Sequence, residues 1–243
     1  MARLARDFGE MVLALAVAAL TVLLVAGCDR PREMPAQPAA APAAAKAAPK
    51  TATPATLDGR GIPATALRHR TELIRNARSV WGLAAPVAVF AAQVHQESGW
   101  RADAKSPVGA RGMAQFMPST ADWLSGLFPE LAANEPYNPS WALRALVTYD
   151  HYLWDRLEAV TPCDRMAFAL SAYNGGLGWV RRDSRLAASR GLAPDAWWDN
   201  VEAVNAGRSV GNWRENRGYP KRILRTLTPR YVAAGYGEGI CHE

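Results

Sequence analysis

Apolar side chains recur at the spacing of an α-helix along most of the chain. One such segment runs from about Ala64 to Trp81, and a second runs from Pro86 to Glu97. Each is followed by a glycine, Gly82 or Gly99, and glycine is common just past the end of a helix. Proline suits the start of a helix, because its missing N–H is not needed there. The pattern therefore predicts two consecutive helices.

The same periodicity continues toward the carboxyl end, with turn residues between the segments. No strand-like alternation or internal repeat interrupts it, so the predicted fold class is mostly α. We expect Ser119 or Thr120 to cap the first of the later helices and Asp164 to cap the third. The later helices are expected, in order, over Pro118 to about Gly126, Asn138 to about Val160, Asp164 to Asn174, Leu177 to Ser189, Ala193 to Val204, and about Trp213 or Arg217 to Ala234.

The amino-terminal segment has the pattern of an export signal. An apolar run from Met11 to Ala26 follows two arginines and is short for a membrane span. It ends in Val25-Ala26-Gly27-Cys28, which resembles the lipobox of bacterial lipoproteins. The resemblance implies a signal peptide over residues 1–27, cleavage before Cys28 and acylation of Cys28. The expected location is the periplasm, on the inner or outer membrane; the alternative is an uncleaved anchor with a chance cysteine.

The segment that follows Cys28 differs in composition from the rest of the chain. Residues 28–60 are mainly Ala, Pro, Lys and Thr, with almost no large apolar side chain. Such a segment cannot bury enough surface to offset the entropy cost of ordering it. We expect a disordered tether there and a folded domain over residues 61–243.

The two remaining cysteines are candidates for a disulfide. Cys163 and Cys241 are left over in a chain expected to reach an oxidising compartment. A bridge between them would stabilise the fold by up to about 4.5 kcal/mol in the chain-entropy model; the alternative is two unrelated buried thiols. The histidines are scattered and no CxxC spacing occurs, so neither a metal site nor a cofactor is predicted.

The formal net charge of +6 indicates a basic surface. A basic surface suits an anionic polymer, although an ordinary solvated surface of mixed charge has the same composition. No nucleic-acid-binding motif is present. Together with the export signal, this argues against nucleic acid as a partner.

Glu97 is the first candidate for chemistry. On a helical wheel it lies under Phe90, on an apolar face and at the carboxyl end of the predicted helix. Burial and the negative pole of the helix dipole would both raise the pKa of its carboxyl group. A glutamic acid that is protonated near neutral pH can act as a general acid. The alternative is an exposed glutamate at a frayed helix end.

Four short segments, in this order, resemble the soluble lytic transglycosylase family of peptidoglycan-cleaving enzymes. They are Glu97-Ser98; Gly109 to Pro118 (GARGMAQFMP) followed by Thr120-Ala121; Ala172-Tyr173-Asn174-Gly175; and Glu215-Asn216-Arg217-Gly218-Tyr219. With the lipobox, the chain resembles a membrane-bound member. The resemblance implies a lysozyme-like helical domain with a groove that holds a glycan strand.

The resemblance also implies a reaction that adds no water. The bond between N-acetylmuramic acid and N-acetylglucosamine is cut as the muramic acid's own 6-hydroxyl attacks its anomeric carbon. Ordinary glycosidases need two carboxyl groups, whereas the four segments supply only Glu97. By resemblance, Glu97 first protonates the leaving oxygen and then accepts the proton of the 6-hydroxyl. The substrate's N-acetyl group stabilises the positive intermediate.

The other roles follow by resemblance, position by position. Tyr219 matches the tyrosine whose hydroxyl holds the catalytic glutamate. Plain core packing is the alternative for Met117, and a helix C-cap is the alternative for Asn174. Pro220 departs from the family pattern, removes a backbone donor and is expected to disturb the last helix. The residues matched to glycan binding are Ser98, Gln115, Met117, Tyr173 and Asn174.

Two rival functions remain open. A hydrolytic muramidase of similar fold would need a second carboxylate, and Asp103 is the acidic residue that follows Glu97 most closely. An inactive peptidoglycan-binding lipoprotein would need neither acid nor Tyr219. The run from Asn212 to Arg217 resembles transglycosylases of mobile conjugative elements, which implies a secretion or conjugation machinery as partner.

Overall fold

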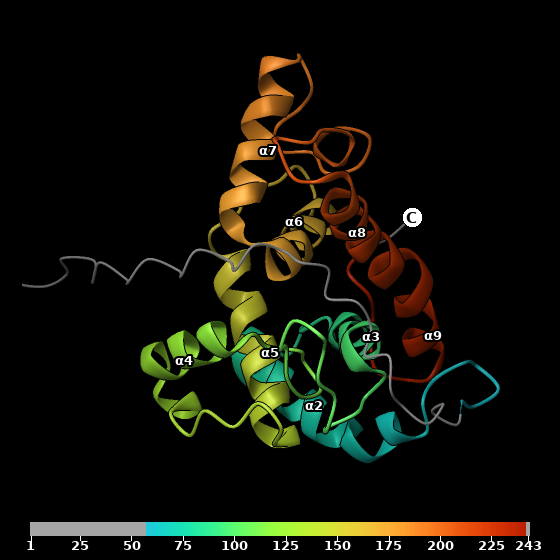
Figure 1. The fold of residues 1–243 in the computed structure, drawn as a ribbon. Coiled ribbons are helices and arrows are strands. Elements are labelled where there is room, and N and C mark those ends of the chain that lie inside the picture. The colour runs from blue at the N-terminus through green and yellow to red at the C-terminus, as the bar shows by residue number, and fades with distance from the viewer. Residues whose placement is uncertain (1–56, 242–243) are drawn as a thin grey trace, which may run out of the picture. The chain divides into compact units, whose positions relative to one another are not determined.

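The computed structural model describes residues 57–241, and this part of the chain is mostly helical (Figure 1). The predicted signal peptide, Cys28 and most of the predicted tether lie outside the described residues. Within the described range there are isolated β-bridges but no strands, which confirms the mostly α class. The helical elements are α2 (Thr65–Trp81), α3 (Val87–Ser98), α4 (Pro118–Leu127), η1 (Pro129–Leu131), α5 (Pro139–Trp154), α6 (Pro162–Gly175), α7 (Leu177–Ser189), η2 (Val201–Ala203), α8 (Val210–Lys221), η3 (Arg222–Leu227) and α9 (Thr228–Ala233).

The folded part begins a few residues before the expected boundary at residue 61. Asp58 accepts backbone N–H bonds from Arg60 and Ile62, both at 2.9 Å, and its own N–H donates to the Ile62 carbonyl at 2.8 Å. Ile62 is buried in the core. No helix within residues 57–241 is both long enough and apolar enough to cross a membrane.

Helix α3 lies at the centre of the core. Almost every residue of this helix is buried, and it packs against α2, η3 and α9. A helix that is apolar all round must be covered on every side, and the surrounding helices provide that cover (Figure 1). The last turn of α3 is therefore held in place by elements from both ends of the domain.

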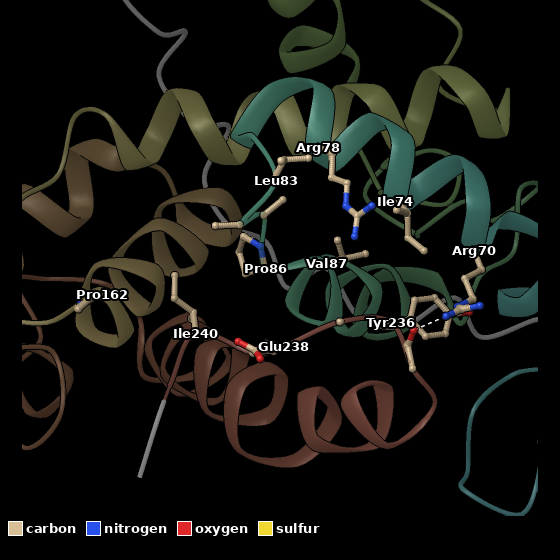
Figure 2. A pocket seen from close by; sticks show the side chains of 15 residues that line it. Arg70, Ile74, Arg78, Leu83, Pro86, Val87, Pro162, Tyr236, Glu238 and Ile240 are labelled. Carbon is tan, nitrogen blue, oxygen red and sulfur yellow. Dashed lines mark hydrogen bonds between the residues drawn. The ribbon is translucent and has the colours of Figure 1, made fainter.

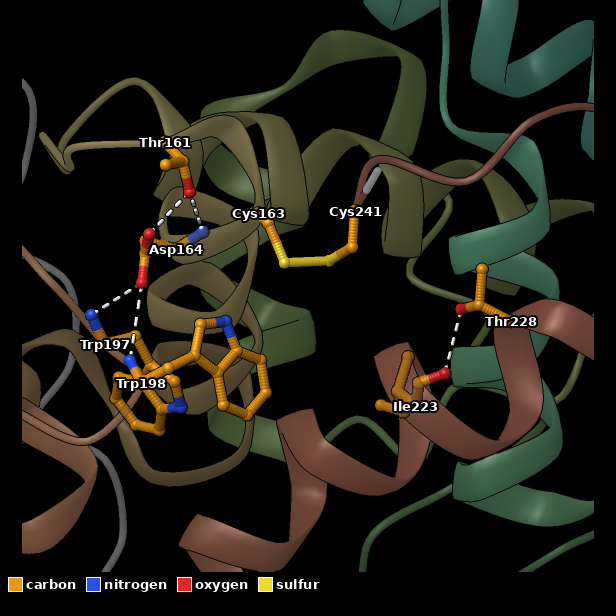
Figure 3. The surroundings of a disulfide bond; sticks show 8 residues. All are labelled: Thr161, Cys163, Asp164, Trp197, Trp198, Ile223, Thr228 and Cys241. Atoms are coloured by element: carbon orange, nitrogen blue, oxygen red, sulfur yellow. Dashed lines mark hydrogen bonds between the residues drawn. A yellow bond between two sulfur atoms is a disulfide. The ribbon is translucent and has the colours of Figure 1, made fainter. Parts of the chain in front are cut away.

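The expected helix over Ala193 to Val204 is wrong. Only the short turn η2 forms in this region. The backbone N–H groups of Trp197 and Trp198 donate to Asp164 Oδ1, at 2.8 and 3.3 Å, instead of to carbonyls four residues earlier (Figure 3). A tertiary hydrogen bond has replaced the helical one.

Two expected helix boundaries also change. Helix α5 ends at Trp154 and not near Val160, because the guanidinium of Arg165 donates twice to the Trp154 carbonyl, at 3.0 and 2.8 Å. Thr161, and not Asp164, caps α6: its side chain accepts the Asp164 N–H at 3.0 Å (Figure 3). The carboxylate of Asp164 therefore accepts hydrogen bonds from the backbone N–H groups of Trp197 and Trp198.

Helix α4 lacks the side-chain cap that the sequence suggested. It begins at Pro118, and Met117 stands at its N-cap position with no side-chain hydrogen bond. Ser119 and Thr120 lie inside the first turn, so the expected cap is wrong. Proline at the first helical position has already removed one of the N–H groups that a cap would satisfy.

The last helical region changes its winding after Pro220. This proline lies inside α8, and η3 continues it as π-helical turns up to Leu227. Pro229 follows in the first turn of α9. Both prolines lack a backbone donor, and the wider turns lie between them. Thr228 Oγ1 donates to the Ile223 carbonyl at 2.8 Å. The expected disturbance of the last helix is confirmed.

The predicted disulfide is confirmed. Cys163, in the first turn of α6, is bonded to Cys241, with an S–S distance of 2.00 Å (Figure 3). The bridge spans 78 residues of sequence. It fastens the segment that follows α9 to the start of α6.

Candidate active site

Glu97 lies in the last turn of α3 and is only 6% exposed. Gly99 ends the helix in a left-handed conformation, with φ of 63°, and its N–H donates to the His95 carbonyl at 2.9 Å. The alternative of an exposed glutamate at a frayed end is therefore wrong. The carboxyl group lies among buried side chains at the carboxyl end of a helix, as the apolar pattern predicted.

Tyr219 reaches Glu97 from the other end of the domain. The phenolic hydroxyl of Tyr219, on α8, donates to Glu97 Oε1 at 2.6 Å, across 122 residues of sequence. Burial, followed by the negative charge of Glu97, raises the pKa of the Tyr219 phenol well above its ordinary value. The tyrosine therefore keeps its proton and remains a donor. A short hydrogen bond of this kind fixes the carboxyl group and stabilises its anion.

Tyr173 joins α6 to the glycine-rich loop. Its hydroxyl donates to the Ala114 carbonyl at 2.7 Å, and its ring lies 5.6 Å from that of Phe116 between centroids. Burial, followed by the charge of Glu97, raises the pKa of the Tyr173 phenol well above its ordinary value. Tyr173 therefore lies within electrostatic reach of Glu97, and its ring packs in the core.

The glycine-rich loop is held by its own side chains. Gln115 is 2% exposed, and its amide nitrogen donates to the carbonyls of Ala104 and Gly112, at 3.2 and 2.9 Å. These bonds hold Gln115 at a φ of 49°, which non-glycine residues seldom adopt. Gly112 has a φ of 72°, and a Cβ there would lie 1.7 Å from the Pro136 carbonyl oxygen. The loop therefore requires glycine at that position.

Ser98 follows Glu97 directly in α3, and Met117 follows the glycine-rich loop at the start of α4. Ser98 is buried, and its hydroxyl accepts the backbone N–H of Arg101 at 3.1 Å, which closes the turn after α3. Met117 is half-buried at the start of α4.

Asn174 lies in the last turn of α6 and is not the C-cap, which is Gly176. The Asn174 side-chain oxygen accepts a hydrogen bond from Asn216 Nδ2 at 3.0 Å. Asn216 is buried; it also donates to the Ser171 carbonyl at 2.9 Å and accepts from the Ser171 hydroxyl at 2.8 Å and from Arg217 at 2.7 Å. Asn216 therefore fixes the orientation of the Asn174 amide.

A buried ionic network contacts Asn216 through Arg217, which donates to the Asn216 side-chain oxygen. Asp183 is fully buried and is paired with Arg217 at 2.7 Å and with Arg208. Arg217 also donates to the carbonyls of Glu202 and Val204, at 3.0 and 2.9 Å. The sequence did not predict this network, because nothing in the arginine-rich helix α7 indicates that Asp183 is buried.

A second buried carboxyl group, also missed, belongs to Asp150 on α5. Gln93 Nε2, one turn before Glu97, donates to Asp150 Oδ1 at 3.3 Å. Burial raises the pKa of the Asp150 carboxyl well above its ordinary value, and the charge of Glu97 acts in the same direction. The sign of this buried group in the sequence is an aspartate within an otherwise apolar helical stripe. Asp103, the acidic residue considered before, is exposed.

A cavity of about 630 Å³ lies elsewhere, between α2, the start of α3 and the segment after α9 (Figure 2). Arg70, Arg78, Tyr236 and Glu238 line it, and Arg70 donates to the Gly235 carbonyl. It lies at the opposite end of α3 from Glu97 and is not part of the candidate site. Among residues 57–241, no group of three His, Cys, Asp or Glu side chains could hold a metal.

The chain is similar in sequence to several known proteins. The model of the transglycosylase SLT domain family matches residues 72–195. The membrane-bound lytic murein transglycosylase F of Shewanella loihica is 36% identical over 111 residues, which cover 45% of this chain and 22% of that protein. The Vibrio cholerae protein of the same name is 32% identical over 165 residues, 60% of this chain and 30% of that protein. The chain thus spans about a quarter of the length of these relatives.

A solved structure is also similar. An inactive mutant of the lytic transglycosylase Slt from Pseudomonas aeruginosa aligns with a TM-score of 0.49 and 21% sequence identity. The alignment covers 72% of this chain and 26% of that one.

Proposed function

Because this chain belongs to the transglycosylase SLT domain family, we propose that it is a lytic transglycosylase that cleaves peptidoglycan without adding water. The bond cut is the β-1,4 bond from N-acetylmuramic acid to N-acetylglucosamine, and the product carries a 1,6-anhydromuramic end. One observation carries the proposal: the buried Glu97 carboxyl accepts the Tyr219 hydroxyl at 2.6 Å. This hydrogen bond joins residues from two of the four family segments and supports the assignment of Glu97 as an oriented acid.

Glu97 performs two proton transfers in this reaction. As the bond from the anomeric carbon to the leaving oxygen breaks, protonated Glu97 gives its proton to that oxygen. The Glu97 carboxylate next accepts the proton of the 6-hydroxyl, whose oxygen bonds to the anomeric carbon and closes the anhydro ring. Glu97 is then protonated again and no water is consumed. Tyr219 keeps its own proton and holds the carboxyl group in both states.

The residues matched to glycan binding belong to the same proposal. We assign Ser98, Met117, Tyr173 and Asn174 to the walls of a glycan groove, with Gln115 shaping the loop between them. The hydroxyl of Tyr173 ties that loop to α6, and Asn216 orients the Asn174 amide. Groups fixed in this way need little reordering when a sugar binds.

We propose a periplasmic, membrane-anchored location. The Cys163–Cys241 disulfide is typical of exported proteins, and the relatives above are named membrane-bound. Acylation of Cys28 would supply the anchor, with the residues between Cys28 and the folded domain as the tether. The resemblance to transglycosylases of mobile elements makes a secretion or conjugation machinery the proposed partner, for which the enzyme would open the wall locally.

Mass spectrometry of digested peptidoglycan tests the reaction. The proposed enzyme releases muropeptides with anhydro ends, which are lighter by one water than hydrolysed ones. Reducing ends would instead show a hydrolytic muramidase. An absence of cleavage with retained binding would show a binding lipoprotein.

A further inference from the structure

Asp150 and Gln93 form a polar pair in the core, and Asp150 interacts electrostatically with the candidate acid Glu97. Both side chains are 0% exposed. Gln93 lies on α3 one turn before Glu97, and Asp150 lies on α5. The single hydrogen bond between them, from Gln93 Nε2 to Asp150 Oδ1, is 3.3 Å long.

Each member of this pair has an oxygen without a hydrogen-bond partner among the described residues. These atoms are Asp150 Oδ2 and Gln93 Oε1, and both are buried. An unpaired polar atom in the core destabilises the fold, and an unpaired charge destabilises it more. A carboxylate has only acceptors, so an ionised Asp150 cannot serve Gln93 Oε1. One proton on Asp150 turns the carboxyl group into a donor, which is the kind of partner that Gln93 Oε1 lacks.

The surrounding groups also favour a neutral Asp150. Glu97 on α3, Tyr173 on α6 and Tyr219 on α8 interact electrostatically with one another and with Asp150, and all of them are acids. A negative charge on Asp150 would add to that of Glu97 in a dry interior. Two coupled carboxyl groups in such a place share their protons, and the group with the better donors ionises first.

Glu97 has the better donor of the two. Its Oε1 accepts a phenolic hydroxyl at 2.6 Å, whereas Asp150 Oδ1 accepts an amide N–H at 3.3 Å. The first proton to leave the pair is therefore that of Glu97. Once Glu97 is ionised, its charge opposes the ionisation of Asp150.

We propose that Asp150 is a positioning residue that remains a neutral carboxylic acid while Glu97 exchanges its proton, and that it joins α5 to α3 through Gln93. This inference deepens the proposed function and rests on it for the role of Glu97. It also removes Asp150 from consideration as the second carboxylate of a hydrolytic mechanism. A buried acid that keeps its proton can neither activate water nor attack a sugar.

Carbon NMR of the full-length protein, labelled at the aspartate carboxyl carbons, tests the protonation state. Asp150→Asn identifies the Asp150 resonance. In the wild type this resonance should keep the chemical shift of a protonated carboxyl group at neutral pH, where an ordinary aspartic acid is already ionised. In Glu97→Gln, where the opposing charge is gone, any titration of Asp150 should move to lower pH. A wild-type Asp150 that titrates near pH 4, as an ordinary aspartate does, overturns the proposal.

A pair of substitutions tests the positioning role. Asp150→Leu removes the partner of Gln93 and should lower kcat about tenfold, with KM little changed. Asp150→Asn is neutral and can still bond to Gln93, so it should restore kcat to within about threefold of the wild type. An asparagine variant as inactive as the leucine variant would show that an ionisable group is required, and the proposal would fail. The NMR titration does not depend on turnover, so failure of the proposed reaction would be seen separately.

Discussion

The hydroxyl of Tyr219 donates to Glu97 Oε1 at 2.6 Å, and burial raises the pKa of the Tyr219 phenol, so the phenol keeps the proton that it donates. Tyr219→Phe removes this donor without opening a large cavity. The carboxyl group of Glu97 then loses its fixed orientation, and kcat should fall about 10- to 100-fold with a smaller change in KM. Steady-state turnover of purified peptidoglycan measures both constants.

Tyr236→Phe is the matched control for that substitution. The Tyr236 hydroxyl is also buried, but it has no hydrogen-bond partner among residues 57–241. It lines the cavity of Figure 2, and its ring packs against Trp100 and Tyr231 without a hydrogen bond to Glu97. Its removal should leave kcat as in the wild type. Equal losses in the two variants would mean that Tyr219 acts only through packing.

Glu97→Gln should abolish turnover while glycan binding remains. The amide keeps the size of the side chain but cannot give or take the proton, and general acid–base catalysis is worth about 10²- to 10⁴-fold. Pull-down on intact peptidoglycan measures binding, and muropeptide release measures turnover. Asp103→Asn, at the exposed acidic residue nearest in sequence, should remain active. A glutamine variant that clears cell walls at the wild-type rate would exclude Glu97 as the acid.

The sequence predicted the parts of this domain that depend on local periodicity. The apolar stripe over Pro86–Glu97 is a helix, and the glycine after it ends that helix. The hydrogen bond between Glu97 and Tyr219 followed from the family resemblance and not from the residues alone. Helical spacing places side chains on a face, but it does not say which distant helix covers that face.

The features that were missed depend on contacts between distant segments. The segment over Ala193–Val204 has a helical pattern, yet Asp164 takes up two of its N–H groups. Asp150 lay within a recognised apolar stripe, and an aspartate in such a stripe is itself a sign of a buried polar pair. Asp183 had no such sign, because its partners Arg208 and Arg217 approach from another helix and a loop.

Asn216→Ala tests whether the orientation of Asn174 matters. The variant loses the hydrogen bonds to Asn174 and Ser171 and leaves buried polar groups unpaired, so the free energy of unfolding should fall by about 2 kcal/mol. KM for peptidoglycan should rise more than kcat falls, because the Asn174 amide is no longer fixed before binding. Asn212→Ala, in the first turn of the same helix, is the control. An unchanged KM in the Asn216 variant would limit that residue to a structural role.

The main effect of the disulfide should be on the free energy of unfolding. Replacing Cys163 and Cys241 together by alanine frees the segment after α9, and the chain-entropy model gives a loss of up to about 4.5 kcal/mol for a loop of this length. Thermal and urea unfolding of the double variant against the wild type measure this loss. Treatment of the wild type with a reductant should reproduce it, and a reductant should have no effect on the double variant.

His95 should make the domain sensitive to mild acid. Burial, followed by the charges of Arg222 and Arg230, lowers the pKa of His95 to about 4, from an ordinary value of 6.5. Between about pH 4 and 6.5 the unfolded chain binds a proton that the folded protein does not. The free energy of unfolding that depends on His95 is therefore largest above pH 6.5 and falls as the pH drops toward 4. Urea unfolding of the wild type at a series of pH values should show this fall, and His95→Gln should reduce it. His151→Gln is the control, because that imidazole is 37% exposed and lies 3.1 Å from the Asp155 carboxylate. If the His95 variant keeps the acid dependence of the wild type, the loss of stability belongs to other groups.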